Sequence, residues 1–143
     1  ARVYIDQVTP QREVIMTVPV GVRYPLHAGS SSKAFLAFLP EDEREAYLER
    51  EPLGSLTGET LVDTYELRRE LERIRAAGYA TSFGERQAGA ASTAAPILDH
   101  RGEPVAVVSV CGPRERFLEE AGHCSRALLE TTRRLSTRMG ARN

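Results

Sequence analysis

The sequence predicts an α+β domain, in which helices pack on a mostly antiparallel sheet. Segments typical of strands come in neighbouring pairs joined by short turns, a pattern that favours antiparallel pairing. Segments typical of helices are grouped in the middle and at the end of the chain, so strands and helices do not alternate regularly. The length of 143 residues fits one domain, large enough to bury a core without disulfides or metal.

The first two strands are predicted at residues 2–8 and 13–20, where apolar and polar side chains alternate. The apolar side chains that share one face of the second segment are Val14, Met16, Val18 and Val20. Residues 9–12, Thr-Pro-Gln-Arg, have the composition of a turn. We therefore expect a hairpin at the start of the chain.

Two helices are predicted next. The serines at 30–32 precede an Ala/Leu-rich run at 33–39, and a serine hydroxyl there can accept a hydrogen bond from a free backbone N–H. Pro40 ends this helix and opens the second one, which has acidic residues in its first turn. We expect the second helix to end at about residue 51.

The third helix is predicted at residues 66–77. Asp63 and Glu66 have the spacing of a capping box, in which the side chain of the first residue accepts from a backbone N–H at the helix start. Gly78 follows the last helical residue, where a left-handed conformation commonly ends a helix. This helix therefore has a defined start and a defined end.

Strands and one helix are predicted in the second half. A strand is expected at 79–85, a hairpin of strands at 93–98 and 103–111 around the turn at 99–102, and a closing helix at 116–139. The strand at 103–111 is apolar on both faces, so we expect it in the centre of the sheet. The predicted element order is β-β-α-α-α-β-β-β-α.

Composition excludes several classes of function. A formal net charge of −1 is too low for a free-standing nucleic-acid binder. The chain has no apolar run near the roughly 20 residues that span a bilayer, and residues 1–8 do not resemble a signal peptide. Cys111 and Cys124 fit free thiols in a reducing cytoplasm. The histidines show no metal-ligand spacing, so we expect no metal or cofactor.

Two motifs carry possible chemistry. Ser30 and Lys33 match the Ser-x-x-Lys motif of serine acylases, but the accompanying Ser-Asp-Asn and Lys-Thr-Gly motifs are missing and Lys33 is the only lysine. We interpret the serines as a helix start, whose backbone amides can bind an anion. Cys111, on an apolar strand, is interpreted as a core or pocket residue, with a thiol nucleophile as the alternative.

Several blocks resemble one family. They are Pro-Leu-His-Ala at 25–28 followed by 33–40, the block at 70–80, Glu85 with Gly89, 94–99 with Gly102, and 106–113. In this order they resemble the effector-binding domain of IclR-type bacterial transcriptional regulators, from about residue 13 to 140. The resemblance implies a GAF-like α+β fold spanning 1–143, homodimers or tetramers, and DNA binding only through an N-terminal winged helix-turn-helix absent from this chain.

The resemblance also implies a pocket for a small effector. Its polar residues would be the backbone amides of Ser30 and Ser31 with Ser82, Ser92, Ser109 and Cys111. We expect its apolar walls from Met16, Val18, Phe35, Phe83 and Ala90. Ser82 stands where an acidic residue is common in the family, so the expected pocket is rich in hydroxyls and poor in side-chain charge. A small organic acid set against the helix N-terminus is the effector that fits.

The predicted function is therefore a non-enzymatic sensor domain of a DNA-binding transcriptional regulator, in which effector binding shifts oligomer state or DNA affinity. One alternative is a thiol-dependent small enzyme on a GAF-like fold that uses Cys111. The other is a dimerisation module whose pocket is vestigial. The sequence does not identify the effector or the interface between subunits.

Overall fold

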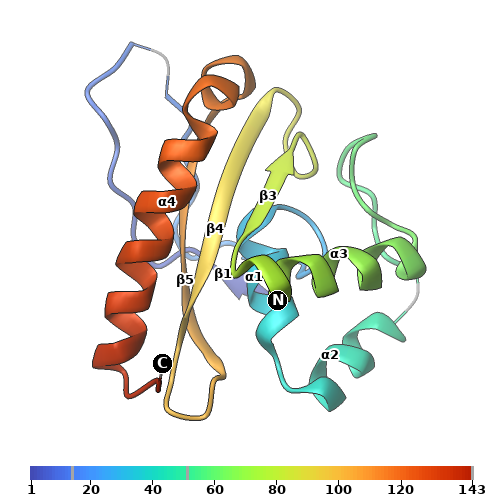
Figure 1. Ribbon diagram of the computed structural model, residues 1–143. Coiled ribbons are helices and arrows are strands. Elements are labelled where there is room, and N and C mark those ends of the chain that lie inside the picture. Colours follow the sequence, from blue (N-terminus) through green and yellow to red (C-terminus); the bar gives the residue numbers. More distant parts are fainter. Residues whose placement is uncertain (14, 51, 143) are drawn as a thin grey trace.

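The computed structural model describes residues 1–13, 15–50 and 52–142. The chain is α+β, and its element order is the predicted one. The sheet β3-β4-β5 lies between helix α4 on one face and helices α1 and α3 on the other (Figure 1). The bounds are β1 Arg2–Val3, β2 Arg23–Tyr24, α1 Ser30–Phe38, α2 Glu41–Leu48, α3 Thr64–Ala77, β3 Ala80–Phe83, β4 Ala90–Leu98, β5 Pro104–Pro113 and α4 Arg114–Arg138.

The sheet is antiparallel, and its register sets which side chains share a face. Ser82 on β3 lies opposite Ser92 on β4, and Ser92 lies opposite Cys111 on β5. Directly opposed residues project from the same face of a sheet, so these three side chains form one row. The row lies on the α1 side, because the Oγ atoms of Ser30 and Ser92 are 2.7 Å apart.

Strand β5 is an edge strand, so its predicted central position is wrong. Among the described residues the sheet order is β3-β4-β5, with β4 in the middle. The apolar composition of β5 has a different cause, because α1 packs on one face of this strand and α4 on the other. Val105 and Val110 remain 47% and 39% exposed. Burial of a strand's two faces thus does not require partners on both of its edges.

The predicted N-terminal hairpin is also wrong. Among the described residues of 1–20, only the two residues of β1 form a strand, and they pair with β2. Residues 15–20 are irregular, and Val14 lies outside the described residues. Ile5 and Val8 are 82% and 95% exposed, so these apolar side chains of the alternating pattern do not lie on a buried face. A two-stranded ribbon without such a face is marginally stable at best.

Helix α1 begins at Ser30, three residues before the predicted run. Its N-cap is Gly29, whose φ of 88° is in the left-handed region that favours glycine. The predicted capping by serine hydroxyls is wrong, since the hydroxyl of Ser32 donates to the carbonyl of Pro25 at 2.7 Å. The backbone N–H of Gly29 instead donates to Oε2 of Glu85 at 3.0 Å. A distant carboxylate therefore replaces the local cap.

Helix α3 confirms the local signals. The side chain of Asp63 accepts from the backbone N–H of Glu66 at 2.9 Å, and Gly78 ends the helix with a φ of 82°. Helix α2 ends at Leu48, short of the predicted end at Glu51, which lies outside the described residues. Strand β4 starts at Ala90, earlier than predicted. The core of buried leucines lies between α1, α3 and the sheet.

Candidate functional site

A small cavity lies where the N-terminus of α1, the start of β4 and the end of β5 meet residues 1–18. Its volume of about 20 Å³ holds about one water molecule. Predicted site residues that line it are Ser30, Ser31, Ser82, Ser92, Cys111, Met16, Val18 and Ala90. The structure therefore brings together, around one space, polar and apolar residues from five separate segments of the chain.

The sheet register explains this convergence. Ser82, Ser92 and Cys111 form the row on the α1 face, and the hydroxyl of Ser30 closes the row from the helix side through its 2.7 Å hydrogen bond with Ser92. Ser30, Ser31 and Ser82 are at most 5% exposed. The hydroxyl-rich wall is thus a buried part of the packing between helix and sheet.

The structure places the other predicted site residues elsewhere. Phe83 is one position out of phase with Ser82, so it lies on the opposite face and packs edge-on against Phe117 of α4, with ring centroids 6.4 Å apart. Ser109 lies one row beyond Cys111, opposite Ala94. Phe35 lines a neighbouring groove instead. Phe83 as a pocket wall is therefore wrong, and neither Ser109 nor Phe35 lines the cavity.

Two arginines and a tyrosine that the sequence analysis missed also line the cavity. The guanidinium of Arg2 lies 4.4 Å from the ring centroid of Tyr4 and 5.2 Å from that of Tyr24. The guanidinium of Arg86 lies 4.8 Å from Tyr24 and 5.6 Å from Tyr4. The β1–β2 pairing brings Arg2 beside Tyr24, and Arg86 reaches the same rings from the loop after β3. The arginine-rich sequence contains no local signal for this contact. The expectation of a pocket poor in side-chain charge is wrong.

The charge on these arginines is not matched by protein carboxylates. In the described part of the chain, no ion pair joins Arg2 or Arg86 to an acidic residue. Burial, with a smaller contribution from Arg86, lowers the pKa of Arg2 below the ordinary arginine value. Its Nη1 atom is buried and has no hydrogen-bond partner among the described residues. The cavity is therefore electropositive on this side.

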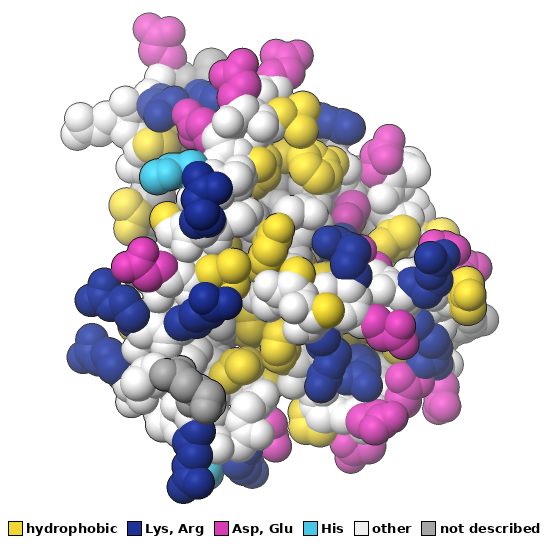
Figure 2. Space-filling view, in the orientation of Figure 1, with side chains coloured by type: hydrophobic (Ala, Val, Ile, Leu, Met, Phe, Trp, Pro, Cys, Tyr) yellow, Lys and Arg dark blue, Asp and Glu magenta, His cyan; other side chains and the backbone are white. Residues whose placement is uncertain are grey.

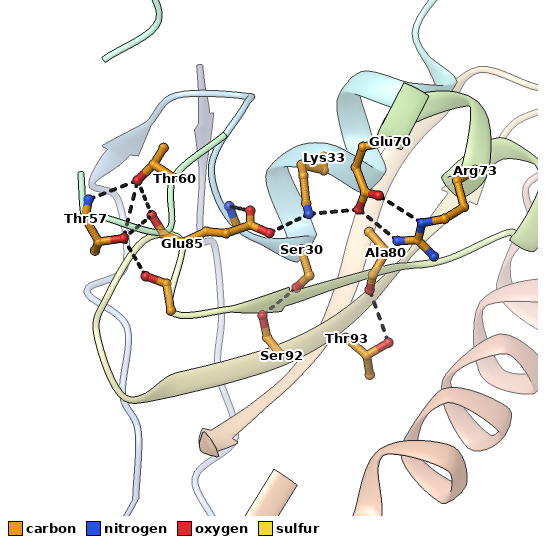
Figure 3. A network of polar contacts seen from close by, with 12 residues as sticks. Ser30, Lys33, Thr57, Thr60, Glu70, Arg73, Ala80, Glu85, Ser92 and Thr93 are labelled. Atoms are coloured by element: carbon orange, nitrogen blue, oxygen red, sulfur yellow. Dashed lines mark hydrogen bonds and ion pairs between the residues drawn. The ribbon is translucent and has the colours of Figure 1, made fainter. Parts of the chain in front are cut away.

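The acidic residue at the cavity is already neutralised. Nζ of Lys33 donates to Oε1 of Glu85 at 2.6 Å and to Oε1 of Glu70 at 2.9 Å, as Figure 3 shows. The backbone carbonyl of Glu85 accepts from the hydroxyls of Thr57 and Thr60. Lys33 of the Ser-x-x-Lys motif is thus a buried structural cation, 2% exposed, that joins α1 to α3 and to the loop after β3.

The first turn of α1 adds hydrogen-bond donors. The backbone N–H groups of Ser30 and Ser31 have no acceptor within the helix, because the first intrahelical bond runs from Lys33 to the carbonyl of Gly29. Both serines line the cavity, and the start of the helix carries a partial positive charge. Backbone amides on one side and guanidinium groups on the other make the cavity suited to an anion.

Cys111 does not have the properties of an activated nucleophile. Cys111 is exposed as a residue, but partial desolvation of its thiol raises its pKa, and this effect outweighs the opposite effect of the nearby Arg86. A reactive cysteine needs a lowered pKa, because the thiolate is the nucleophile. Among residues 1–13, 15–50 and 52–142, no group of His, Cys, Asp or Glu could hold a metal ion. Helices in the same part of the chain are all too short or too polar to cross a bilayer.

Comparisons with known proteins agree with this fold. A family model described as "Bacterial transcriptional regulator IclR C-terminal" matches residues 1–137. The structure superimposes on the crystal structure of IclR from Thermotoga maritima with a TM-score of 0.90 and 37% identity, covering 96% of this chain and 56% of that one. The fold is that of a GAF-like domain of a bacterial transcriptional regulator. The chain belongs to the IclR family and corresponds to its C-terminal domain.

Curated relatives are also regulators of transcription. The transcriptional repressor IclR of Escherichia coli K12 is 36% identical over 118 residues, which cover 82% of this chain and 43% of that protein. The repressor AllR of the same strain is 35% identical over 139 residues, covering 96% of this chain and 51% of that protein. The chain thus spans about half the length of the curated relatives it matches, and the resemblance seen in the sequence is confirmed.

Proposed function

We propose that this chain is the effector-sensing domain of a cytoplasmic DNA-binding regulator, and that its cavity binds a small organic acid without transforming it. The observation that carries this proposal is the pair of guanidinium groups of Arg2 and Arg86, stacked on the same two tyrosines and matched by no carboxylate in the described residues. A carboxylate bound there would neutralise one of two like charges held in a partly buried site and so reduce their repulsion.

A carboxylate matches the donors geometrically. One of its oxygens would accept from the backbone amides of Ser30 and Ser31, and the other from Arg2 or Arg86, because a planar guanidinium fits a carboxylate edge. An amine would find no counter-charge, since Glu85 is already paired with Lys33. The arginines therefore support the organic acid that the sequence predicts from the helix start and from Ser82 standing where an acidic residue is common in the family.

The small volume of the cavity links binding to a change in structure. About 20 Å³ holds a water molecule and no carboxylic acid, so the ligand has to displace side chains that line the space. Arg2, Tyr4, Met16 and Val18 belong to the N-terminal segment and cover the cavity from one side. A shift of these residues is the route by which an acid would bias the oligomer state, and with it the DNA affinity of the whole regulator, by no more than its differential affinity for the two states.

DNA contact is assigned to a part of the regulator outside this chain. The net charge is −1, and positive and negative side chains are interspersed on the face shown in Figure 2. A DNA-binding surface needs a basic excess on one face. We propose a homodimer or tetramer as the functional unit, with no membrane partner. The raised pKa of Cys111 gives the thiol-enzyme alternative no support.

Matched ligand pairs test the proposal. We would measure thermal unfolding and calorimetric binding of the domain with acetate, propionate, butyrate and benzoate, each beside its uncharged amide at the same ionic strength. We expect at least one acid to raise the melting temperature in proportion to the logarithm of its concentration, with no effect of the amide. If acids and amides behave alike, or neither binds, the proposed function is wrong, and a dimerisation module becomes the better description.

A further inference from the structure

We propose that the effector is an amphipathic carboxylic acid, whose apolar part occupies a second compartment beside the cavity. This compartment, the β5 groove, is lined by residues 1–6 and Arg23 on one side, by Ser31 and Phe35 of α1, and by residues 105–107 of β5. The inference rests on the proposed function, because it assumes that the carboxylate lies at the arginines. It adds the class of acid and the place of its tail.

The groove and the cavity are neighbours separated by side chains. Arg2, Tyr4 and Ser31 line both spaces, so these residues form the wall between them. A displacement of the Arg2 side chain would join the two. Arg2 is held by hydrogen bonds from its Nε to Ser32 and from its Nη2 to Tyr4, whereas Nη1 is buried without a partner among the described residues. A carboxylate at this wall would give Nη1 the acceptor that it lacks.

Volume distinguishes the two compartments. Pockets that bind small molecules usually measure roughly 300–1,000 Å³. The groove, at about 480 Å³, lies in this range, whereas the cavity, at about 20 Å³, does not. The cavity therefore has room for a polar head only after side chains move, and the groove is the adjoining space large enough for the rest of a molecule.

Much of the wall of the groove is apolar, although Arg2, Arg23 and Asp6 also line it. Phe35 and Val107 are partly buried at the edge of the core, while Val3, Ile5 and Val105 are 45%, 82% and 47% exposed. A hydrocarbon or aryl group against these side chains would remove apolar surface from water. The apolar part of the lining thus favours an acid that carries a hydrocarbon or aryl tail.

A series of acids of increasing chain length tests this assignment. We would measure the affinities of acetate, butyrate and hexanoate for the domain by calorimetry. Burial of one methylene contributes about fourfold in affinity, so we expect hexanoate to bind about 15-fold more tightly than butyrate.

Two tryptophan variants locate the tail. Val105→Trp fills the groove, and Val110→Trp places the same side chain on the opposite face of β5, outside the groove. We expect the hexanoate-to-butyrate affinity ratio to fall from about 15 towards one in Val105→Trp and to stay at about 15 in Val110→Trp. Thermal unfolding without ligand shows whether both variants are folded.

The outcomes separate this inference from the proposed function. If short acids bind but affinity does not grow with chain length, the groove assignment is overturned and the carboxylate site stands. The same holds if affinity grows with length equally in wild type and Val105→Trp. If no acid binds while the domain is folded, both the proposed function and the inference are wrong.

Discussion

Lys33 and Glu85 form a buried ion pair of 2.6 Å that holds the start of α1 against the loop after β3. The second carboxylate oxygen of Glu85 accepts from the backbone of Gly29, so one side chain both neutralises the lysine and caps the helix. The pair stands next to the cavity and fixes the position of the Ser30 amide relative to Arg86, the residue after Glu85.

Loss of the lysine charge should destabilise the domain strongly. Lys33→Met would leave the buried carboxylate of Glu85 without its cation, whereas Glu70 would keep its pair with Arg73. Loss of one partner of a buried pair typically costs about 3–5 kcal/mol. The matched control is Arg69→Gln, which removes an exposed pair with Glu66 and should change stability by less than about 0.5 kcal/mol. Urea unfolding followed by circular dichroism measures both. A loss below about 1 kcal/mol for Lys33→Met would contradict this account.

Stability should decline in acid because of Glu70. Burial by itself would raise the pKa of Glu70, but hydrogen bonds from Arg73 and Lys33 lower it below its ordinary value of 4.5. A carboxyl group with a depressed folded-state pKa contributes stability that is complete above the unfolded-state pKa and is lost as pH falls through the folded-state pKa. We therefore expect Glu70→Gln to flatten the stability profile below about pH 4.5. A profile as steep as that of wild type would show that Glu70 is not responsible.

Removal of the Arg86 charge should weaken acid binding. Hydrogen bonds to charged groups contribute about 1.5–3 kcal/mol, so Arg86→Gln should reduce the affinity for the best acid by about tenfold or more. Arg86→Lys keeps the charge but lacks the planar guanidinium group, which can bind both oxygens of a carboxylate. We therefore expect an intermediate affinity. Arg69→Gln, far from the cavity on α3, is the calorimetric control. Equal affinities in all the variants would place the anion elsewhere.

Cys111 should react slowly with alkylating agents at neutral pH. Partial desolvation of the thiol raises its pKa above the ordinary 9.0, so only a small fraction is thiolate at pH 7 although the residue is exposed. In a Cys124→Ser background, we expect the rate of iodoacetamide labelling to keep rising with pH beyond pH 9. A rate that levels off below pH 8 would reveal an activated thiol and would revive the enzyme alternative.

Local signals in the sequence were sufficient for the helices. Asp63, Glu66 and Gly78 act within one or two turns of chain, and their predicted roles are those seen in the structure. The placement of Ser92 opposite Cys111 does not follow from the turn at 99–102 alone, because the two strands shift register between Ile97 and Leu98. The hairpin of β4 and β5 around this turn was nevertheless predicted, as were the ends of α3. These features depend on interactions between residues close together in the sequence, so they can be predicted from it.

Features that depend on distant parts of the chain were missed. The cap of α1 comes from Glu85, more than fifty residues away, so the serines before the apolar run suggested a local cap that does not exist. Arg2 and Arg86 meet only through Tyr4 and Tyr24. Nothing in the composition of an arginine-rich chain singles out these two, and their placement required the fold.

The row formed by Ser82, Ser92 and Cys111 constrains how this domain can change its ligand. A slip of β4 by a single residue would turn the side chains that face the cavity towards α4. The alanines of β4 that pack in the core would then also face the opposite side of the sheet. An insertion in β4 between Ser92 and its neighbours would therefore replace the whole cavity-facing set of side chains at once. A substitution at one of these positions changes a single contact and leaves the others in place.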